Sequence, residues 1–278
     1  MEFPERIDYL VIGHICRDLT PAGPVIGGTA AYAAATARVL GCRTAVVTSY
    51  ADGDDWQTFL PDVTIYALPS PRTTTFENVY TPQGRIQTVH AVASTITASD
   101  IPLAYRRPQI AHIGPVANEV EPSVAALFSN SMIGLTPQGW MRAWDEQGHV
   151  TAQGMQDAQE LLPLAAATFI SDQDLISPSM LDEFRDLSRI LVLTQGAAGS
   201  IVYFGDQALS FPAPHVRVVD ETGAGDIFAT AYMVRLHQTG GDPWEAARFA
   251  NRIAALSVTE ATLPDKMRRL AEEVARSS

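Results

Sequence analysis

A repeating alternation of short apolar runs with helical segments is the feature that most constrains this fold. Ile7–Gly13 and Thr44–Ser49 are short and mostly apolar, which is typical of strands buried on both faces of a parallel sheet. Between them, the Ala-rich run Ala30–Leu40 predicts a helix that ends at Gly41. The order strand, helix, strand predicts a parallel crossover unit, so the chain opens as an α/β protein.

The same alternation returns in the second half of the chain. Strands are predicted at Ile110–Gly114, Met132–Leu135, Ala167–Ser171 and Ile190–Thr194, with a hairpin of Ser200–Phe204 and Ala208–Phe211. Helices are predicted at Ser123–Ser129, Met155–Ala165, Ser179–Leu187, Ala224–Gln238, Asp242–Val258 and Asp265–Arg276. The helix start at Asp242 is the best marked, with Asp as the cap, Pro243 at the first position and Glu245 closing a capping box.

The segment between these two halves has a different pattern. Val63–Leu68, Thr74–Tyr80 and Arg85–Ala91 are short, β-branched and half polar, and the last two flank the turn sequence Thr81–Gly84. A hairpin that is polar on both sides predicts a flap outside the main sheet, and the alternative is an edge extension without function. No repeat, low-complexity tract or linker occurs, so we predict a single domain over 1–278.

The balance of charges excludes several classes of protein. Lys and Arg number 19 against 31 Asp and Glu, so the formal net charge is −12. A field of that sign repels phosphate backbones and anionic lipid, which argues against nucleic acid and membranes as partners. Lys266 is the single lysine and no Gly-Lys dipeptide occurs, which excludes a Walker A loop. Any phosphate site must therefore use backbone amides and arginines.

The location of the protein follows from similar arguments. No apolar run reaches the ~18 residues that a membrane span needs. Met1–Arg6 lacks the basic and then apolar order of a signal peptide, and Cys16 and Cys42 are too few for a disulfide framework. We therefore expect a reduced, cytoplasmic protein.

The stretch Asp220-Glu-Thr-Gly-Ala-Gly-Asp226 carries the most chemical information. Two glycines lie where a loop enters the predicted helix Ala224–Gln238, and the first amides of a helix have no partner within it. Together with the helix dipole, the amides of Gly223, Ala224 and Gly225 predict an anion site. The alternative is an ordinary glycine turn in which Asp226 caps the helix.

Asp226 suggests a reaction rather than simple anion binding. A carboxylate beside a static phosphate would repel it, whereas a carboxylate that holds a substrate hydroxyl would aim that hydroxyl in line at the phosphorus. A strong base is not needed, because phosphoryl transfer has a loose transition state in which positioning dominates. The motif therefore predicts transfer of a phosphoryl group to an alcohol.

The run from Asp220 to Asp226 resembles the C-terminal signature of the ribokinase-like (PfkB) carbohydrate kinases, and the similarity extends over nearly the whole chain. The resemblance implies a three-layer α/β sandwich with a mainly parallel central sheet and a small β lid, formed by parts of 12–24 and 69–92. It implies that Asp226 is the catalytic base beside the anion hole. It further implies that Asp18, Gly27 and Gly28 bind the substrate, with Tyr32 where the family often has an Asn that contacts the sugar.

The resemblance also implies a donor side of the site. Thr194, Gly196 and Gly199 match a nucleotide-side Thr-x-Gly-x-x-Gly pattern, and Asn251 lies on the late helix that family members place beside adenine. The family's Asn-x-x-Glu, linked to magnesium through water, aligns with Ser171–Asp174, where Asp174 would replace the Glu with a shorter reach. The implied cofactors are ATP and Mg²⁺.

A final candidate is Arg142. Gln138-Gly-Trp-Met-Arg142 follows a predicted strand end, where open α/β sheets bind ligands, and the pattern resembles a branch of the family that includes inositol kinases. With lysine nearly absent, Arg142 is the residue that we expect to contact the transferred phosphoryl group. The alternative is a surface arginine.

Together these features predict an ATP-dependent kinase that transfers the γ-phosphoryl group to a hydroxyl of a small sugar or cyclitol. Two alternatives stay open. One is a nucleoside kinase of the same superfamily, which stacking of Tyr32 on a base would fit. The other is a sugar- or nucleotide-binding protein without turnover, against which the intact Asp226 argues. The expected partners are a small polyol and ATP, and a homodimer is one expected assembly because a short lid leaves the pocket for a second subunit to cover.

Overall fold

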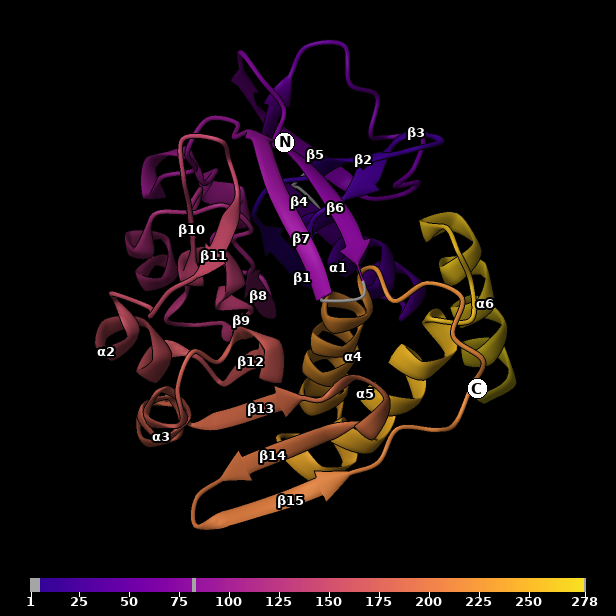
Figure 1. The fold of residues 1–278 in the computed structure, drawn as a ribbon. Helices are drawn as coiled ribbons and strands as arrows, with labels where there is room; N and C mark the ends of the chain where they lie inside the picture. Colours follow the sequence, from indigo (N-terminus) through magenta and orange to yellow (C-terminus); the bar gives the residue numbers. More distant parts are fainter. Residues whose placement is uncertain (1–5, 82–83, 278) are drawn as a thin grey trace.

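The central element is a nine-stranded sheet in which seven neighbouring strands, β13 through β5, run parallel (Figure 1). In spatial order its strands are β15 (Gln207–Phe211), β14 (Ser200–Phe204), β13 (Ile190–Thr194), β12 (Ala167–Ser171), β9 (Met132–Leu135), β8 (Ile110–Ile113), β1 (Tyr9–Ile12), β4 (Thr44–Ala51) and β5 (Thr64–Ser70). The computed structural model describes residues 6–81 and 84–277. In the described part of the chain, the ladders β13–β14 and β14–β15 at one edge are antiparallel, so β14 runs against the other strands of this sheet.

Helices cover both faces of the sheet, which confirms the predicted three-layer α/β architecture. One face carries α1 (Thr29–Val39), α4 (Ala224–Gln238), α5 (Pro243–Ser257) and α6 (Leu263–Ser277). The other carries α2 (Ala158–Leu161), α3 (Pro178–Leu187) and the 3₁₀ segment η3 (Pro122–Phe128). Alternate residues of β1 pack into the hydrophobic cores on the two faces of the sheet. Tyr9 and Val11 pack on the side of α1 and α4, and Leu10 and Ile12 pack on the side of α2 and α3. Burial on both faces is what makes this strand continuously apolar.

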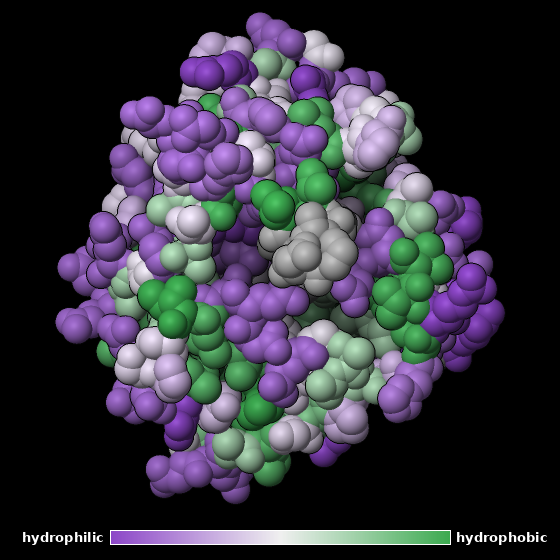
Figure 2. Space-filling model, in the orientation of Figure 1, coloured by the Kyte–Doolittle hydropathy of each residue, from purple (hydrophilic) through white to green (hydrophobic). Residues whose placement is uncertain are grey.

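A separate four-stranded sheet lies beside the main one. Its order is β3 (Gly23–Gly27), β2 (Cys16–Thr20), β6 (Thr75–Thr81) and β7 (Gly84–Ala91), and a short hairpin of β10 (Arg142–Trp144) and β11 (Val150–Ala152) is also present. The space-filling view shows this face of the molecule hollowed near its middle, where hydrophilic residues predominate (Figure 2). Two segments far apart in the sequence, β2–β3 and β6–β7, thus build one small sheet.

Two predictions about secondary structure are wrong, and the structure places a third segment. Val63–Leu68 overlaps β5 (Thr64–Ser70), the parallel edge strand of the main sheet, where a half-exposed face suits its half-polar pattern. The helix predicted over Met155–Ala165 shrinks to the four residues of α2 and a 3₁₀ turn, because Pro163 cannot donate the hydrogen bond that would continue it. The segment predicted as the helix Ser123–Ser129 is the 3₁₀ segment η3. The hairpin β10–β11 was not predicted at all.

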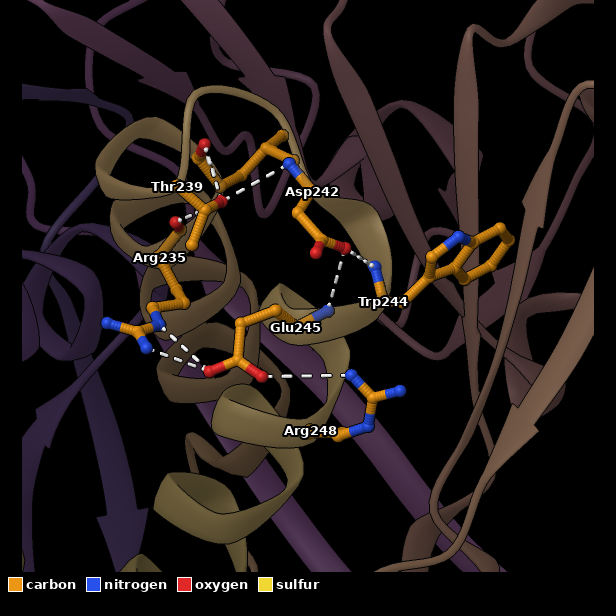
Figure 3. Close-up of polar contacts among 7 residues, drawn as sticks. Arg235, Thr239, Asp242, Trp244, Glu245 and Arg248 are labelled. Carbon is orange, nitrogen blue, oxygen red and sulfur yellow. Dashed lines mark hydrogen bonds and ion pairs between the residues drawn. The ribbon is translucent and has the colours of Figure 1, made fainter.

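The start of α5 confirms one half of the predicted capping box. The Asp242 carboxylate accepts the amides of Trp244 (2.9 Å) and Glu245 (3.1 Å), as an N-cap should (Figure 3). The Glu245 carboxylate does not close the box. It pairs instead with Arg235 of α4 (2.8 Å) and Arg248 (3.7 Å), which ties α5 to α4.

Two buried side chains fix the loops that follow strands of the main sheet. His14, just after β1, bonds through Nδ1 to the Thr74 hydroxyl (2.6 Å) and through Nε2 to the Ser94 carbonyl (3.0 Å). These three residues lie at three of the four places where the chain passes between the two sheets. Glu119 accepts the backbone amides of His14 (3.0 Å), Val116 (2.9 Å) and Ala117 (2.6 Å), and so fixes the loop after β1 against the loop after β8.

Glu119→Ala should therefore destabilise the fold strongly. Removing the carboxylate leaves three buried amides without their acceptor, and we expect a loss of about 2–4 kcal/mol in the free energy of unfolding. Urea denaturation measures this, with Glu121→Ala as the control because Glu121 is exposed. The control should change stability by less than about 0.5 kcal/mol. Equal effects of the two substitutions would contradict the role given to Glu119.

Candidate active site

The turn before α4 is shaped by glycine and by an aromatic ring. Gly223 is the N-cap of α4 with a φ of 76°, in the left-handed region that favours glycine. A Cβ on Gly223 would also collide with the ring of Tyr32, which comes from α1 and is 5% exposed. This position favours a Tyr32 that fills the space beneath the turn over the stacking on a base that a nucleoside kinase would use.

One of the three amides predicted to bind an anion is used by the protein. The Ala224 amide donates to the Glu221 carbonyl (3.0 Å), so it does not face the site as a bare donor. The amides of Gly223 and Gly225 remain the expected anion donors. A Cβ on Gly225 would meet no described atom within 4 Å, so the turn is open on that side.

Asp226 lies in the first turn of α4, and the residue is half-buried. Its pKa is raised to about 6, chiefly by burial and also by the negative charges of Asp18 and Asp174. A hydrogen bond from the Thr29 side chain and the positive charge of Arg142 oppose that rise. Residues of four other elements, β2, α1, β10 and the 3₁₀ turn Asp172–Asp174, therefore act on this one carboxylate.

The Gly27-Gly28 pair makes room for the groups around Asp18. Asp18 lies on β2, and its carboxylate occupies the space where a Cβ of Gly27 would stand. Gly28 has a φ of 86°, and a Cβ there would meet the His14 carbonyl oxygen at 2.5 Å and the Cys16 sulfur at 2.8 Å. The two glycines let β2 and β3 approach the start of α1 closely, directly before Thr29.

Arg142 is not the surface residue that was the alternative to a role in the site. It is 8% exposed at the start of β10. Its Nη1 donates to the Val116 carbonyl (2.8 Å), its Nη2 donates to Gln138 Oε1 (2.6 Å), and its guanidinium lies 5.6 Å from the ring centre of Phe76 on β6. A buried cation needs such partners. The positive charge of Arg142 lowers the pKa of the Asp226 carboxyl.

Asp174 is linked to Arg142 through Gln138. The Gln138 amide nitrogen donates to Asp174 Oδ1 (2.9 Å), while Asp174 Oδ2 accepts the Ser171 amide (2.9 Å). Both carboxylate oxygens of Asp174 therefore have protein partners. Among residues 6–81 and 84–277, no group of three or more His, Cys, Asp or Glu side chains is placed to hold a metal ion. A direct metal site in the protein is not what these residues fit.

The predicted donor-side residues lie at and near the end of β13. Thr194 is its last residue, and its hydroxyl donates to the Ile170 carbonyl (3.3 Å). Gly196 and Gly199 form a turn closed by a bond from the Gly199 amide to the Gly196 carbonyl (3.0 Å). Asn251 is 4% exposed, and its amide nitrogen donates to Ser200 Oγ (2.9 Å) and to the Ala247 carbonyl (3.0 Å). Asn251 thus ties α5 to β14.

Two residues of the site were missed by the sequence reasoning. The sequence could have indicated Thr29, because it follows a Gly-Gly pair and stands at the start of a helix. Gln138 belonged to the stretch that drew attention to Arg142, but an amide that bridges two charged groups leaves no sequence signal of its own.

Known proteins resemble the chain in two ways. The model of the pfkB family carbohydrate kinases matches residues 159–265. The ribokinase of Bacillus subtilis (strain 168) is 44% identical over 68 residues, which are 24% of this chain and 23% of that protein. A fructokinase of Escherichia coli is 28% identical over 186 residues, 59% of each chain. The matched segments therefore span about a quarter and three fifths of these relatives.

Solved structures extend the likeness to nearly the whole chain. A pyrophosphate-dependent kinase in the ribokinase family has a TM-score of 0.82 in its sulfate complex, with 23% identity over 95% of this chain and 99% of that one. A pyrophosphate-dependent kinase in the ribokinase family complexed with a pyrophosphate analog and myo-inositol has a TM-score of 0.81, with 23% identity over 95% of this chain and 99% of that one. Adenosine kinase from Sinorhizobium meliloti has a TM-score of 0.76, with 17% identity over 98% of this chain and 100% of that one.

These identities are low, so the structural matches establish the fold, which is the ribokinase-like fold implied by the sequence. The described residues include no helix with the length and apolar character of a membrane span. The motif from Asp220 to Asp226 falls inside the segment that the family model matches. By that match and by its fold, the chain is similar to the pfkB family carbohydrate kinases.

Proposed function

We propose that the protein phosphorylates a hydroxyl group of a small sugar or cyclitol, with ATP as the donor. The proposal rests on the place of Asp226 in the first turn of α4, directly after the glycine turn at Gly223. Burial and the charges of Asp18 and Asp174 raise its pKa to about 6, against the effects of Thr29 and Arg142. A carboxylate with that pKa is ionised at neutral pH, and its pKa lies close to neutral pH. Both properties suit a group that accepts a proton during the reaction.

In the proposed reaction, Asp226 accepts the proton of the substrate hydroxyl. The hydroxyl oxygen forms a bond to phosphorus while the bond between that phosphorus and the bridging oxygen of the donor breaks. The amides of Gly223 and Gly225, with the positive end of α4 behind them, stabilise the charge on the transferred group. Arg142 adds a fixed positive charge that the Val116 carbonyl and Gln138 hold in place.

The small sheet would serve as the lid over the acceptor. Asp18 projects from β2, one of its strands, and a carboxylate can accept hydrogen bonds from two neighbouring hydroxyls. We propose that parts of 12–24 and 69–92 cover the substrate and exclude water, within a single domain. Strands β2, β3, β6 and β7 lie within or next to these ranges.

Magnesium would be carried in with the donor phosphates. Because both Asp174 oxygens already accept hydrogen bonds, this residue would meet the ion through water. When bound, Mg²⁺ supplies charge that neutralises the phosphate oxygens.

Pyrophosphate is a second candidate donor. The solved structure with a TM-score of 0.82 is that of a pyrophosphate-dependent kinase. In this chain the amide nitrogen of Asn251, the residue expected beside adenine, already donates to two internal acceptors.

Parallel assays with ATP and with pyrophosphate, each against pooled sugars, cyclitols and nucleosides, separate the donors and acceptors. Activity on nucleosides alone would favour the nucleoside kinase alternative, and tight binding without turnover would favour a binding protein.

Asp226→Asn should lower turnover by about 10²–10⁴-fold while the protein stays folded. The same substitution should stabilise the fold at pH 7, by roughly 1–3 kcal/mol, because the folded site disfavours the ionised carboxylate. Because the pKa of Asp226 in the folded protein is about 6, the disfavoured negative charge forms only as pH rises through about 6. Below about pH 4 the folded carboxyl is protonated, so the stability gained by Asp226→Asn should vanish there. Turnover assays and thermal unfolding at both pH values measure these effects, and turnover equal to that of the native protein would end the assignment.

The pH dependence of kcat/KM should show an acid limb near pH 6, because Asp226 must be ionised to accept the proton. Arg142→Met removes a positive charge that lowers this pKa, so the limb should move to higher pH. Asp18→Asn removes a negative charge that raises it, so the limb should move to lower pH. The two variants serve as controls for each other, and shifts in the same direction would contradict the proposed arrangement.

A further inference from the structure

The only lysine of the chain is buried next to the turn that leads to Asp226. Lys266 lies in the first turn of α6, and its side chain is 0% exposed. Its Nζ donates to the Asp220 carbonyl (2.6 Å) and to the Ser257 carbonyl (3.3 Å), and lies 4.0 Å from Asp220 Oδ1. Asp220 is the first residue of the motif that ends at Asp226.

Burial of the Lys266 ammonium is unfavourable, so the contacts that stabilise the charge there matter for its role. Burial lowers the pKa of Lys266, while the negative charges of Asp220 and Glu260 oppose that effect. The N-terminal turn of its own helix α6 also disfavours a positive charge. The ammonium is instead stabilised by the last residue of α5, whose carbonyl lies at the negative end of that helix.

The groups that Lys266 holds define the turn. Asp220 Oδ1 accepts the Thr222 amide (2.6 Å), so the side chain that the ammonium faces also bends the backbone toward Gly223. The amides of Val219 and Asp220 both donate to the Val258 carbonyl (2.7 and 3.2 Å), directly after Ser257. The start of the turn is therefore fixed to the end of α5 by two amides and one ammonium.

We infer that Lys266 is a positioning residue, whose buried ammonium fixes Asp220 against the end of α5 and thereby sets the place of the Gly223 and Gly225 amides and of Asp226. The catalytic half of this inference, the effect on Asp226, rests on the proposed function. Its structural half, the order of the turn, can be measured without any turnover.

The test compares Lys266→Met with Leu270→Ala. The first removes the charge and keeps most of the length of the side chain. The second is a matched control, because Leu270 is 0% exposed on the same helix and packs in the core of α1, α4 and α5 rather than on the turn. Both variants should lower the melting temperature. If Lys266→Met does not fold, Lys266→Gln replaces it, since its amide keeps a neutral donor toward Asp220.

The first readout is hydrogen exchange at the Thr222 and Ala224 amides, both of which are bonded within the turn. In Lys266→Met their exchange should accelerate at least about tenfold relative to amides in the middle of α5, and in Leu270→Ala it should not. The affinity for pyrophosphate, measured by calorimetry, should fall at least about fivefold in Lys266→Met alone.

The second readout is kinetic. In Lys266→Met, kcat should fall at least about tenfold while KM for the acceptor stays within about threefold, because the acceptor is held by other residues. In Leu270→Ala both should stay within about twofold. A Lys266→Met variant that matches Leu270→Ala in exchange or in kcat overturns the inference. If the native protein phosphorylates no acceptor, the proposed function fails, and exchange and pyrophosphate affinity then decide the structural half alone.

Discussion

The site depends on how the charge of one carboxylate is balanced. Asp226 is half-buried, with Asp18 and Asp174 adding negative charge and with Arg142 and the Thr29 hydroxyl opposing it. The outcome is a carboxylate that is harder to ionise than a free one, yet ionised at neutral pH. Such a balance costs stability, and proteins keep costly arrangements of this kind chiefly where chemistry needs them.

The fold supplies the means of bringing these groups together. In a parallel sheet the carboxyl ends of neighbouring strands meet at one edge, so the loops after β1, β8, β9 and β12 all open toward the same place. Glu119 then fixes two of these loops to each other through backbone amides. Gln138 bridges Arg142 and Asp174 in the same region. Side chains that are neither acid nor base in the proposed reaction therefore determine its geometry.

Patterns that depend on neighbouring residues could be predicted from the sequence, and those that depend on distant contacts could not. The buried strands of the main sheet and the bounds of α4 followed from apolar periodicity and turn residues. The place of β5 did not, because a half-polar strand looks the same at the edge of either sheet. The motif at Asp226 was readable, whereas the burial of Arg142 and the bridging role of Gln138 arise only when separate loops meet. The bond from the Ala224 amide to Glu221 likewise depends on the exact path of the turn.

The contact between Arg142 and Phe76 joins the body of the protein to the small sheet. If β6 moved away, the guanidinium would lose this ring, and Asp18 on the neighbouring strand β2 would move with it. Water would then reach Asp226 and the negative charge of Asp18 would act on it less, so two of the causes that raise its pKa would weaken. The basicity of the carboxylate would thus be coupled to the position of the small sheet and greatest when that sheet is closed.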